Sequence, residues 1–233
     1  MHFATSLIPG SLIKRHKRFL AEVRLADGTL VTAHCPNTGA MLTCSTAGSD
    51  VLLSRSDNPL RKYPLTLEMV RSGTTWVGVN TARTNAVVAE ALLQRCIKEF
   101  PQTTKVVREV TTSKGTRLDL QVIEEEGMTY VEVKTCSLAI DGCAMFPDAV
   151  TKRGSKHLHE LIRLAEIGEA AAVFFLVTRM DADRFAPARH IDPAYGKALD
   201  QAERAGVRVL AYQARATSNG IEVVGALPVE LSA

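Results

Sequence analysis

The chain of 233 residues lacks any hydrophobic run long enough to cross a membrane, and its first residues lack the charged-then-apolar order of a secretory signal. Internal repeats and low-complexity linkers are also absent. Hydrophobic residues make up 46% of the chain and charged residues 23%, a balance typical of a packed core rather than of disorder. We therefore expect a cytoplasmic protein, with no membrane partner, of one large domain or two modest ones.

Several chemical signatures are missing as well. The sequence contains no P-loop, no dinucleotide-binding fingerprint and no Ser-His-Asp pattern. Its five cysteines form an odd number without a C-x-x-C spacing, which is typical of reduced core cysteines in a reducing compartment. Cys136, Cys143 and His157 are the one combination that could hold zinc, but they lack the paired-ligand spacing of zinc sites.

The chain has a small net charge, and its charged residues are unevenly spread. The formal net charge is only +3, from 28 Lys and Arg against 25 Asp and Glu. Residues 1–80 carry nine of the basic residues and five of the acidic ones, so the positive excess lies at the front of the chain. This distribution suits contact with a polyanion without requiring it.

The front of the chain has the pattern of a small β-domain. Residues 18–25 alternate between apolar and polar, Asp27-Gly28 is a strong hairpin turn signal, and residues 29–34 follow as the partner strand. Three more short strands are expected over residues 50–54, 63–70 and 74–79. Five short strands in a basic segment favour an OB-like β-barrel over residues 1–80, although other small β-domains share this pattern.

The pattern changes near residue 80, and residues 81–233 are expected to form an α/β domain with a central mixed sheet. Helical spacing predicts helices over residues 85–100, 155–168 and 192–206, with Asn85 as a cap for the first. A hairpin is expected over residues 117–134, and buried strands over residues 171–177 and 207–214. Without a linker between them, the two domains should pack directly.

The hairpin RLDLQVIEEEGMTYVEVK places charged groups on both arms. Alternation puts Glu132 and Lys134 on the same side of their strand. A two-residue turn at Glu126-Gly127 would set Asp119 opposite Lys134 and gather the polar side chains on one face. A loop of odd length would instead bury charges among aliphatic side chains, which is costly. The even loop is therefore favoured.

Two carboxylates and an ammonium on one face can do specific chemistry. Asp119 and Glu132 are oxygen ligands of the kind that Mg²⁺ or Mn²⁺ prefers, and Lys134 could position an attacking water or stabilise charge on a phosphate. Glu90, in the first predicted helix, could add a third carboxylate. Such a site would hydrolyse a phosphodiester. A half-exposed hairpin with a charged outer face explains the same residues, and both interpretations stay open.

Basic side chains supply candidate nucleic-acid contacts. Arg153, Lys156 and His157 lie near the start of a predicted helix, where free N–H groups and the helix dipole favour a phosphate. The front domain adds Lys14, Arg15, Lys17, Arg18, Arg61 and Lys62. Mixed with aromatic residues, they are typical of a single-strand binding face. A solvated surface accounts for them equally well.

Four separated blocks closely resemble one bacterial family, that of the sugar fermentation stimulation protein A (SfsA). They are HCPNTGAM at residues 34–41, YVEVKTCSLA at 130–139, FPDAVTKRGSKHL at 146–158 and FAPARHID at 185–192. The resemblance runs from about Phe19 to the end of the chain. It implies an OB-like barrel followed by a nuclease-like domain of the PD-(D/E)XK type. It also implies binding of double- or single-stranded DNA without sequence preference, and a suggested regulatory role in sugar metabolism, notably that of maltose.

The same resemblance assigns roles to residues. Asp119 matches the acid of the first strand, Glu132 and Lys134 match the second strand, and Glu90 matches the helix acid. Leu118 replaces the proline of the nuclease pattern, and Ser155 stands where the family would have glutamine. Three hypotheses follow: a DNA-binding regulator, a Mg²⁺- or Mn²⁺-dependent nuclease, or an interaction scaffold that has lost both activities. Strand preference and oligomeric state stay open.

Overall fold

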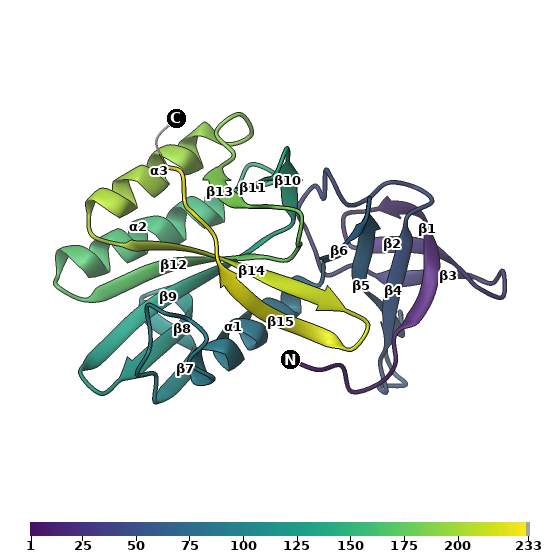
Figure 1. Ribbon diagram of the computed structural model, residues 1–233, viewed down its shortest axis with the longest axis horizontal. Helices are drawn as coiled ribbons and strands as arrows, with labels where there is room; N and C mark the ends of the chain where they lie inside the picture. Colours follow the sequence, from purple (N-terminus) through teal and green to yellow (C-terminus); the bar gives the residue numbers. More distant parts are fainter. Residues whose placement is uncertain (232–233) are drawn as a thin grey trace.

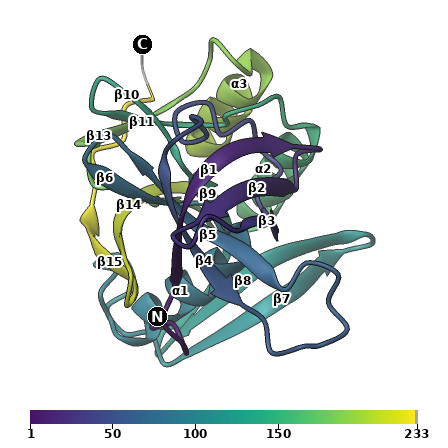
Figure 2. The same cartoon turned by 90° about the vertical axis from the view of Figure 1, so that its right-hand side faces the viewer.

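The computed structural model describes residues 1–231. A small β-barrel lies beside a larger layered α/β unit, with the barrel strands on the right and helices α2 and α3 on the left of Figure 1. Figure 2 views the molecule from the barrel end. No helix within the described residues is both long and apolar enough to span a bilayer.

The barrel is built from short strands. They are β1 (Ile8–His16), β2 (Leu20–Leu25), β3 (Leu30–His34), β4 (Asp50–Arg55), β5 (Leu65–Ser72) and β6 (Thr75–Gly78). Their order is β3-β2-β1-β4-β5-β6, and a parallel bridge between His34 and Thr66 joins β3 to β5. That bridge closes the first five strands into a barrel, so the OB-like fold is confirmed.

Strand β1 is the barrel strand that the sequence pattern missed. Its Pro9-Gly10 pair resembles a loop, and its end is basic rather than alternating. Pairing on both sides, to β2 and β4, decides its conformation. Gly10 is required there because a Cβ atom at this position would lie 2.5 Å from Cγ1 of Val23.

The α/β unit has a central mixed sheet, as expected. The sheet has six strands in the order β15-β14-β12-β9-β8-β7. Its strands are β7 (Lys105–Ser113), β8 (Thr116–Glu124), β9 (Gly127–Cys136), β12 (Ala170–Val177), β14 (Arg208–Thr217) and β15 (Gly220–Ala226). The central strands β9, β12 and β14 run parallel, and the outer pairs are antiparallel. A small second sheet contains β10 (Leu138–Ile140), β11 (Cys143–Phe146) and β13 (Arg184–Pro187).

Helices cover both faces of the large sheet, which explains why β12 is apolar along its whole length. Helix α1 (Thr84–Leu93) follows a 3-10 turn (Thr81–Arg83) and packs on one face, where Leu92 and Phe174 share a core. Helices α2 (Lys152–Glu166) and α3 (Pro193–Arg204) cover the other face, where Leu161 and Phe175 share a second core.

Two helix boundaries differ from the sequence expectation for local reasons. Helix α2 starts three residues early because Thr151 caps it, accepting a hydrogen bond from the Gly154 backbone N–H at 3.0 Å. Helix α1 ends at Leu93 because Arg95 adopts a left-handed conformation with φ of 58°. Asn85 does not cap α1; it lies in the first turn of the helix and faces β8.

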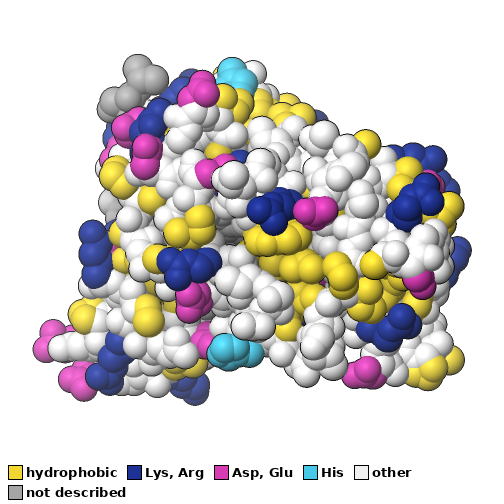
Figure 3. All heavy atoms as spheres, turned by 45° about the vertical axis from the view of Figure 1, so that its right-hand side comes forward, with side chains coloured by type: hydrophobic (Ala, Val, Ile, Leu, Met, Phe, Trp, Pro, Cys, Tyr) yellow, Lys and Arg dark blue, Asp and Glu magenta, His cyan; other side chains and the backbone are white. Residues whose placement is uncertain are grey.

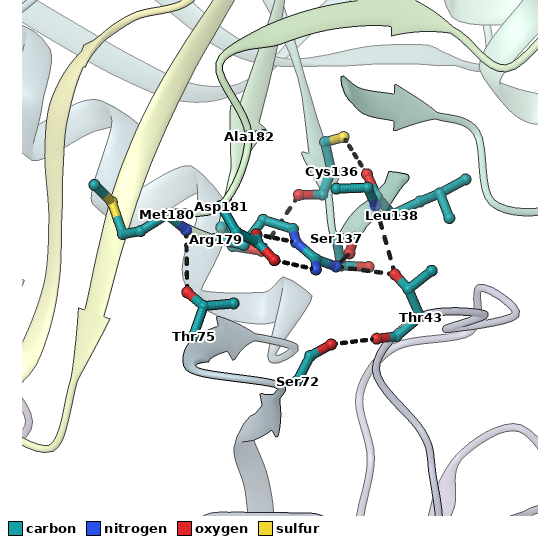
Figure 4. A network of polar contacts seen from close by, with 12 residues as sticks. Thr43, Ser72, Thr75, Cys136, Ser137, Leu138, Arg179, Met180, Asp181 and Ala182 are labelled. Carbon is teal, nitrogen blue, oxygen red and sulfur yellow. Dashed lines mark hydrogen bonds and ion pairs between the residues drawn. The ribbon is translucent and has the colours of Figure 1, made fainter. Parts of the chain in front are cut away.

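Arg179 fastens the barrel to the sheet unit (Figure 4). This side chain is only 3% exposed, and its guanidinium donates to the Ser137 carbonyl at 2.8 Å and to Thr43 Oγ1 of the barrel at 2.9 Å. Two further bonds, of 2.6 and 2.7 Å, reach the carboxylate of Asp181. Nearby, Thr178 exchanges backbone and hydroxyl bonds with Gly78 at the end of β6. A domain boundary near residue 80 stays a prediction.

We expect Arg179→Ala to lower the free energy of unfolding by about 3 kcal/mol, because charge-assisted bonds are lost and a buried carbonyl is left unpaired. Urea denaturation monitored by circular dichroism measures this loss. Arg184→Ala is the matched control, because the Arg184–Asp183 pair is exposed and should contribute less than about 1 kcal/mol. Equal losses in the two variants would contradict the role given to Arg179.

Candidate nucleic-acid and metal site

A cleft of about 490 Å³ lies between the barrel and the sheet unit. The barrel contributes Arg18 and the loop of residues 37–39. Strand β9 and helix α2 contribute the opposite wall, with Lys134 and Arg153 among its side chains. The remaining lining combines neutral polar side chains with apolar ones and with three carboxylates, those of Asp119, Glu132 and Asp148.

The β8–β9 hairpin brings the predicted acidic residues into this cleft. Glu124 pairs with Gly127, so the turn is Glu125-Glu126 and the expected turn at Glu126-Gly127 was wrong by one residue. The loop still has an even length, so the polar side chains keep a common face as predicted. The shifted register, which pairs Leu120 with Val131, moves Asp119 away from its expected place opposite Lys134. Asp119 Oδ2 instead accepts a hydrogen bond from the Val133 backbone N–H at 2.8 Å.

Glu132 is the most buried member of the site, at 2% exposure. Its Oε1 accepts a bond of 2.5 Å from Lys134 Nζ and a second, very short bond from His157 Nδ1 on α2. Its Oε2 is buried without a hydrogen-bond partner among the described residues. Because α2 covers this face of the sheet, the hairpin does not present these charges to solvent.

The pKa of Asp119 is raised and that of Glu132 is lowered, because the two buried carboxyl groups have different charged neighbours. Burial raises the pKa of Asp119, and the negative charge of Glu132 raises it further, against the bonds from Val133 and Asn85. Burial also opposes ionisation of Glu132, but His157 and Lys134 outweigh it and hold the pKa of Glu132 below its usual value. The site therefore contains one strongly stabilised anion and one carboxyl group that ionises reluctantly.

A hard divalent cation fits this donor set. The unpartnered Oε2 of Glu132 and the carboxylate of Asp119 are oxygen ligands, and a cation would relieve the repulsion between the two acids. Residues 1–231 contain no group of three or more His, Cys, Asp or Glu placed to hold a metal. Two protein carboxylates, completed by waters or phosphate oxygens, are a usual arrangement for Mg²⁺.

The structure does not bring Glu90 to this site. Its carboxylate lies 3.1 Å from the N-terminal ammonium of Met1, and it lines a different pocket with His2 and Glu222. Glu90 follows Asn85 by five residues on α1 and therefore lies on a different side of the helix. Asn85 does line the cleft, and it donates to Asp119 Oδ1 at 2.8 Å.

The zinc combination is not assembled either. The Cys136 thiol is buried and donates to the Met145 carbonyl, and burial raises its pKa far above that of a free thiol. His157 is held by Glu132.

The predicted basic residues divide into free and structural ones. Arg18 and Arg153 are exposed and line the cleft. Lys17 is exposed in the turn between β1 and β2. Arg15, by contrast, is used inside the barrel, where its guanidinium donates to the Asn37 carbonyl at 2.6 Å and to the carbonyls of residues 18, 39 and 40.

The other predicted basic residues lie away from the cleft. Lys14 pairs with Glu22 at 3.4 Å, Arg61 contacts His34 in a separate pocket on the barrel, and Lys62 lies over the Tyr63 ring. Lys156 lines a pocket that adjoins the cleft. On the face drawn in Figure 3, Lys and Arg side chains are spread among Asp and Glu around a central hydrophobic patch, so no broad basic surface is found there.

Sequence reasoning noted Asp148 just after the hairpin but gave it no role; the structure shows that it joins the two walls of the cleft. Its Oδ2 accepts a bond from the Met41 backbone N–H at 2.8 Å, and a Cβ atom on Gly39 would lie 2.4 Å from its Oδ1. A larger residue at position 39 would displace the Asp148 carboxylate. The sequence contained a signal for this contact, because Gly39 and Asp148 belong to two of the four blocks that resemble the SfsA family.

The fold and site together define a two-domain protein, in which an OB-like barrel and a mixed α/β sheet enclose a cleft with buried carboxylates. Residues 13–79 match the family model of the SfsA N-terminal OB domain, and residues 82–220 match that of the sugar fermentation stimulation protein RE domain. The chain therefore belongs to the sugar fermentation stimulation protein (SfsA) family.

Individual relatives agree with this placement. A sugar fermentation stimulation protein homolog from Desulfotalea psychrophila is 54% identical over 96% of this chain and 95% of the relative. A homolog from Citrifermentans bemidjiense is 46% identical over 99% of this chain and the whole relative. The structure of Pyrococcus furiosus SfsA in complex with Ca²⁺ superposes with a TM-score of 0.91 at 25% identity, covering 99% of this chain and 98% of that one.

Carboxyl ¹³C NMR titration should place the pKa of Asp119 above that of an ordinary aspartate, because burial and Glu132 both oppose its ionisation. Asn85→Ala should raise the pKa of Asp119 further, since it removes a bond that favours the anion. Gln94→Ala, on the opposite end of α1, is the control and should leave it unchanged. A pKa of Asp119 at or below its ordinary value would contradict this account of the site.

Proposed function

We propose that the interdomain cleft binds DNA, single- or double-stranded, without sequence preference. The observation that carries this proposal is a polar cleft with a free cation on each wall, Arg18 from the barrel and Arg153 from α2. Cations and neutral polar groups of this kind contact phosphates and sugars, which carry no sequence information. OB-like barrels are frequent partners of oligonucleotides, which supports a nucleic acid as the ligand.

Asp119 and Glu132 are the residues that would hold Mg²⁺ or Mn²⁺ in the cleft. The Ca²⁺ complex of the Pyrococcus furiosus relative supports a divalent cation in this family. When bound, such an ion supplies charge neutralisation at a phosphate and acidifies a coordinated water. His157 and Lys134 hold Glu132 through its Oε1, which leaves its second oxygen available to a ligand.

Hydrolysis of a DNA phosphodiester is the second candidate function. Lys134 favours it, because its ammonium lies 2.5 Å from Glu132 Oε1, lines the same cleft as Asp119, and can stabilise negative charge that develops on a phosphate. The protein would then be a nuclease of the PD-(D/E)XK type. A role in regulating sugar metabolism, notably that of maltose, would follow from DNA binding.

DNA binding should weaken steeply with salt, since log K falls by roughly 0.7 to 0.9 per phosphate contact for each unit of log salt concentration. We expect Arg18→Ala/Arg153→Ala to weaken binding about tenfold and to reduce the salt slope by between about 1 and 2. Fluorescence anisotropy with labelled oligonucleotides of unrelated sequences measures both quantities.

Lys197→Ala/Arg204→Ala removes the same charge from the exposed side of α3, outside the cleft, and should leave DNA affinity nearly unchanged. Salt-insensitive binding, or an equal loss in this control, would overturn the proposed binding site.

Cleavage is tested separately with labelled single- and double-stranded DNA in EDTA, Mg²⁺ or Mn²⁺. We expect metal-dependent cleavage that falls at least about 100-fold in Asp119→Ala and Lys134→Ala, because each removes a group placed at the phosphate. Binding of DNA by Lys134→Ala should stay largely intact. Circular dichroism confirms folding of each variant. Binding by the wild type without cleavage under any metal condition would reject the nuclease and retain the DNA-binding proposal.

A further inference from the structure

A second pocket, of about 460 Å³, adjoins the cleft beside the first turn of α2. It shares Arg153 and His157 with the cleft, so the two spaces are neighbours. Its remaining charged lining consists of Arg117 and Lys156, and no carboxylate of the described residues lines it. Three cations therefore surround a space next to the buried acids of the site.

The pocket has two walls from distant parts of the sequence. One wall is the turn between β7 and β8, where Gly115 has φ of 75°, and the other is the start of α2. Lys156 Nζ donates to the Gly115 carbonyl at 3.1 Å, which holds this ammonium against the turn. In Figure 2 the hairpin of β7 and β8 extends beyond the barrel, and Gly115, Arg117 and Lys156 are exposed.

Strand alternation aims Arg117 toward the same side as Asp119, because the two lie two residues apart on β8. Arg117 Nε pairs with Glu109 at 2.7 Å, but both side chains are largely exposed, at 62% and 48%. An exposed pair of this kind contributes little, so Arg117 can exchange its partner for a phosphate at small cost.

We propose that this basic pocket binds the phosphodiester next to the one held at Asp119 and Glu132, along a single strand of DNA. This site rests on the proposed DNA binding. The strand of DNA would run from Arg18 on the barrel, past the carboxylates, to the β7–β8 turn. Arg153, which lines both spaces, lies between the two phosphates.

A single strand suits the dimensions better than a duplex does. Each space has the volume of a pocket for one small-molecule ligand, and Glu132 lies at 2% exposure between walls from both domains. A strand with unpaired bases can enter such a space, whereas the paired bases and second backbone of a duplex need a wider one.

Arg117→Ala/Lys156→Ala tests the proposal with fluorescein-labelled oligothymidylates of about 4 and about 16 nucleotides, the range of lengths that single OB domains cover. For the longer probe we expect a loss of affinity of roughly tenfold at low salt. The salt slope should fall by about 1.4, or roughly 0.7 for each phosphate contact on a single strand. The charge-conserving variant Arg117→Lys/Lys156→Arg should restore most of the binding, and Lys197→Ala/Arg204→Ala should bind like the wild type.

Each outcome bears on a different claim. If the wild type binds and Arg18→Ala/Arg153→Ala weakens it, but Arg117→Ala/Lys156→Ala matches the α3 control, the pocket is not a phosphate site and the proposed cleft stands. A duplex that binds more tightly than the single strand and loses as much affinity in Arg117→Ala/Lys156→Ala would overturn the single-strand assignment. No binding by the wild type would overturn both proposals.

Discussion

The carboxylate of Glu132 is buried in the sheet, and the arrangement around it depends on stabilising that charge. Lys134 from the same strand and His157 from α2 both bond its Oε1, so donors from two elements stabilise this anion. Asp119 must then ionise beside an existing anion, and its pKa is raised accordingly. A buried pair of acids is costly unless a cation or bonded donors compensate, so this part of the sheet lowers the stability of the fold more than apolar residues would.

The cleft itself is a product of domain docking. The barrel alone offers Arg18 and a polar loop, and the sheet unit alone offers the acids and Arg153. Contacts of Arg179 with Thr43, and of Asp148 with the Met41 backbone, hold the two walls at a fixed separation. These contacts are polar and specific, as expected where two domains must be aligned for a shared ligand and not simply packed together.

Basic residues serve two purposes that composition cannot separate. The guanidinium groups of Arg15 and Arg179 donate hydrogen bonds to carbonyls and a hydroxyl of the protein. Arg18, Arg117 and Arg153 keep theirs exposed on the walls of the cleft or of the adjoining pocket. The small net charge of +3 therefore does not reveal that Arg117, Arg153 and Lys156 line one pocket that no carboxylate of the described residues lines. Local placement decides the affinity for a polyanion, because screening limits the reach of surface charge to about 10 Å.

Sequence patterns predicted the OB-like barrel, the mixed sheet, and the shared face of Asp119, Glu132 and Lys134, because turn signals and strand alternation are local properties. They did not determine β1, whose conformation comes from pairing on two sides, or the exact turn of the β8–β9 hairpin. Only the tertiary structure separated Glu90 from the other acids, placed His157 on Glu132, and brought Asp148 to Gly39. Those relations join elements far apart in the chain, and packing between domains and layers sets them.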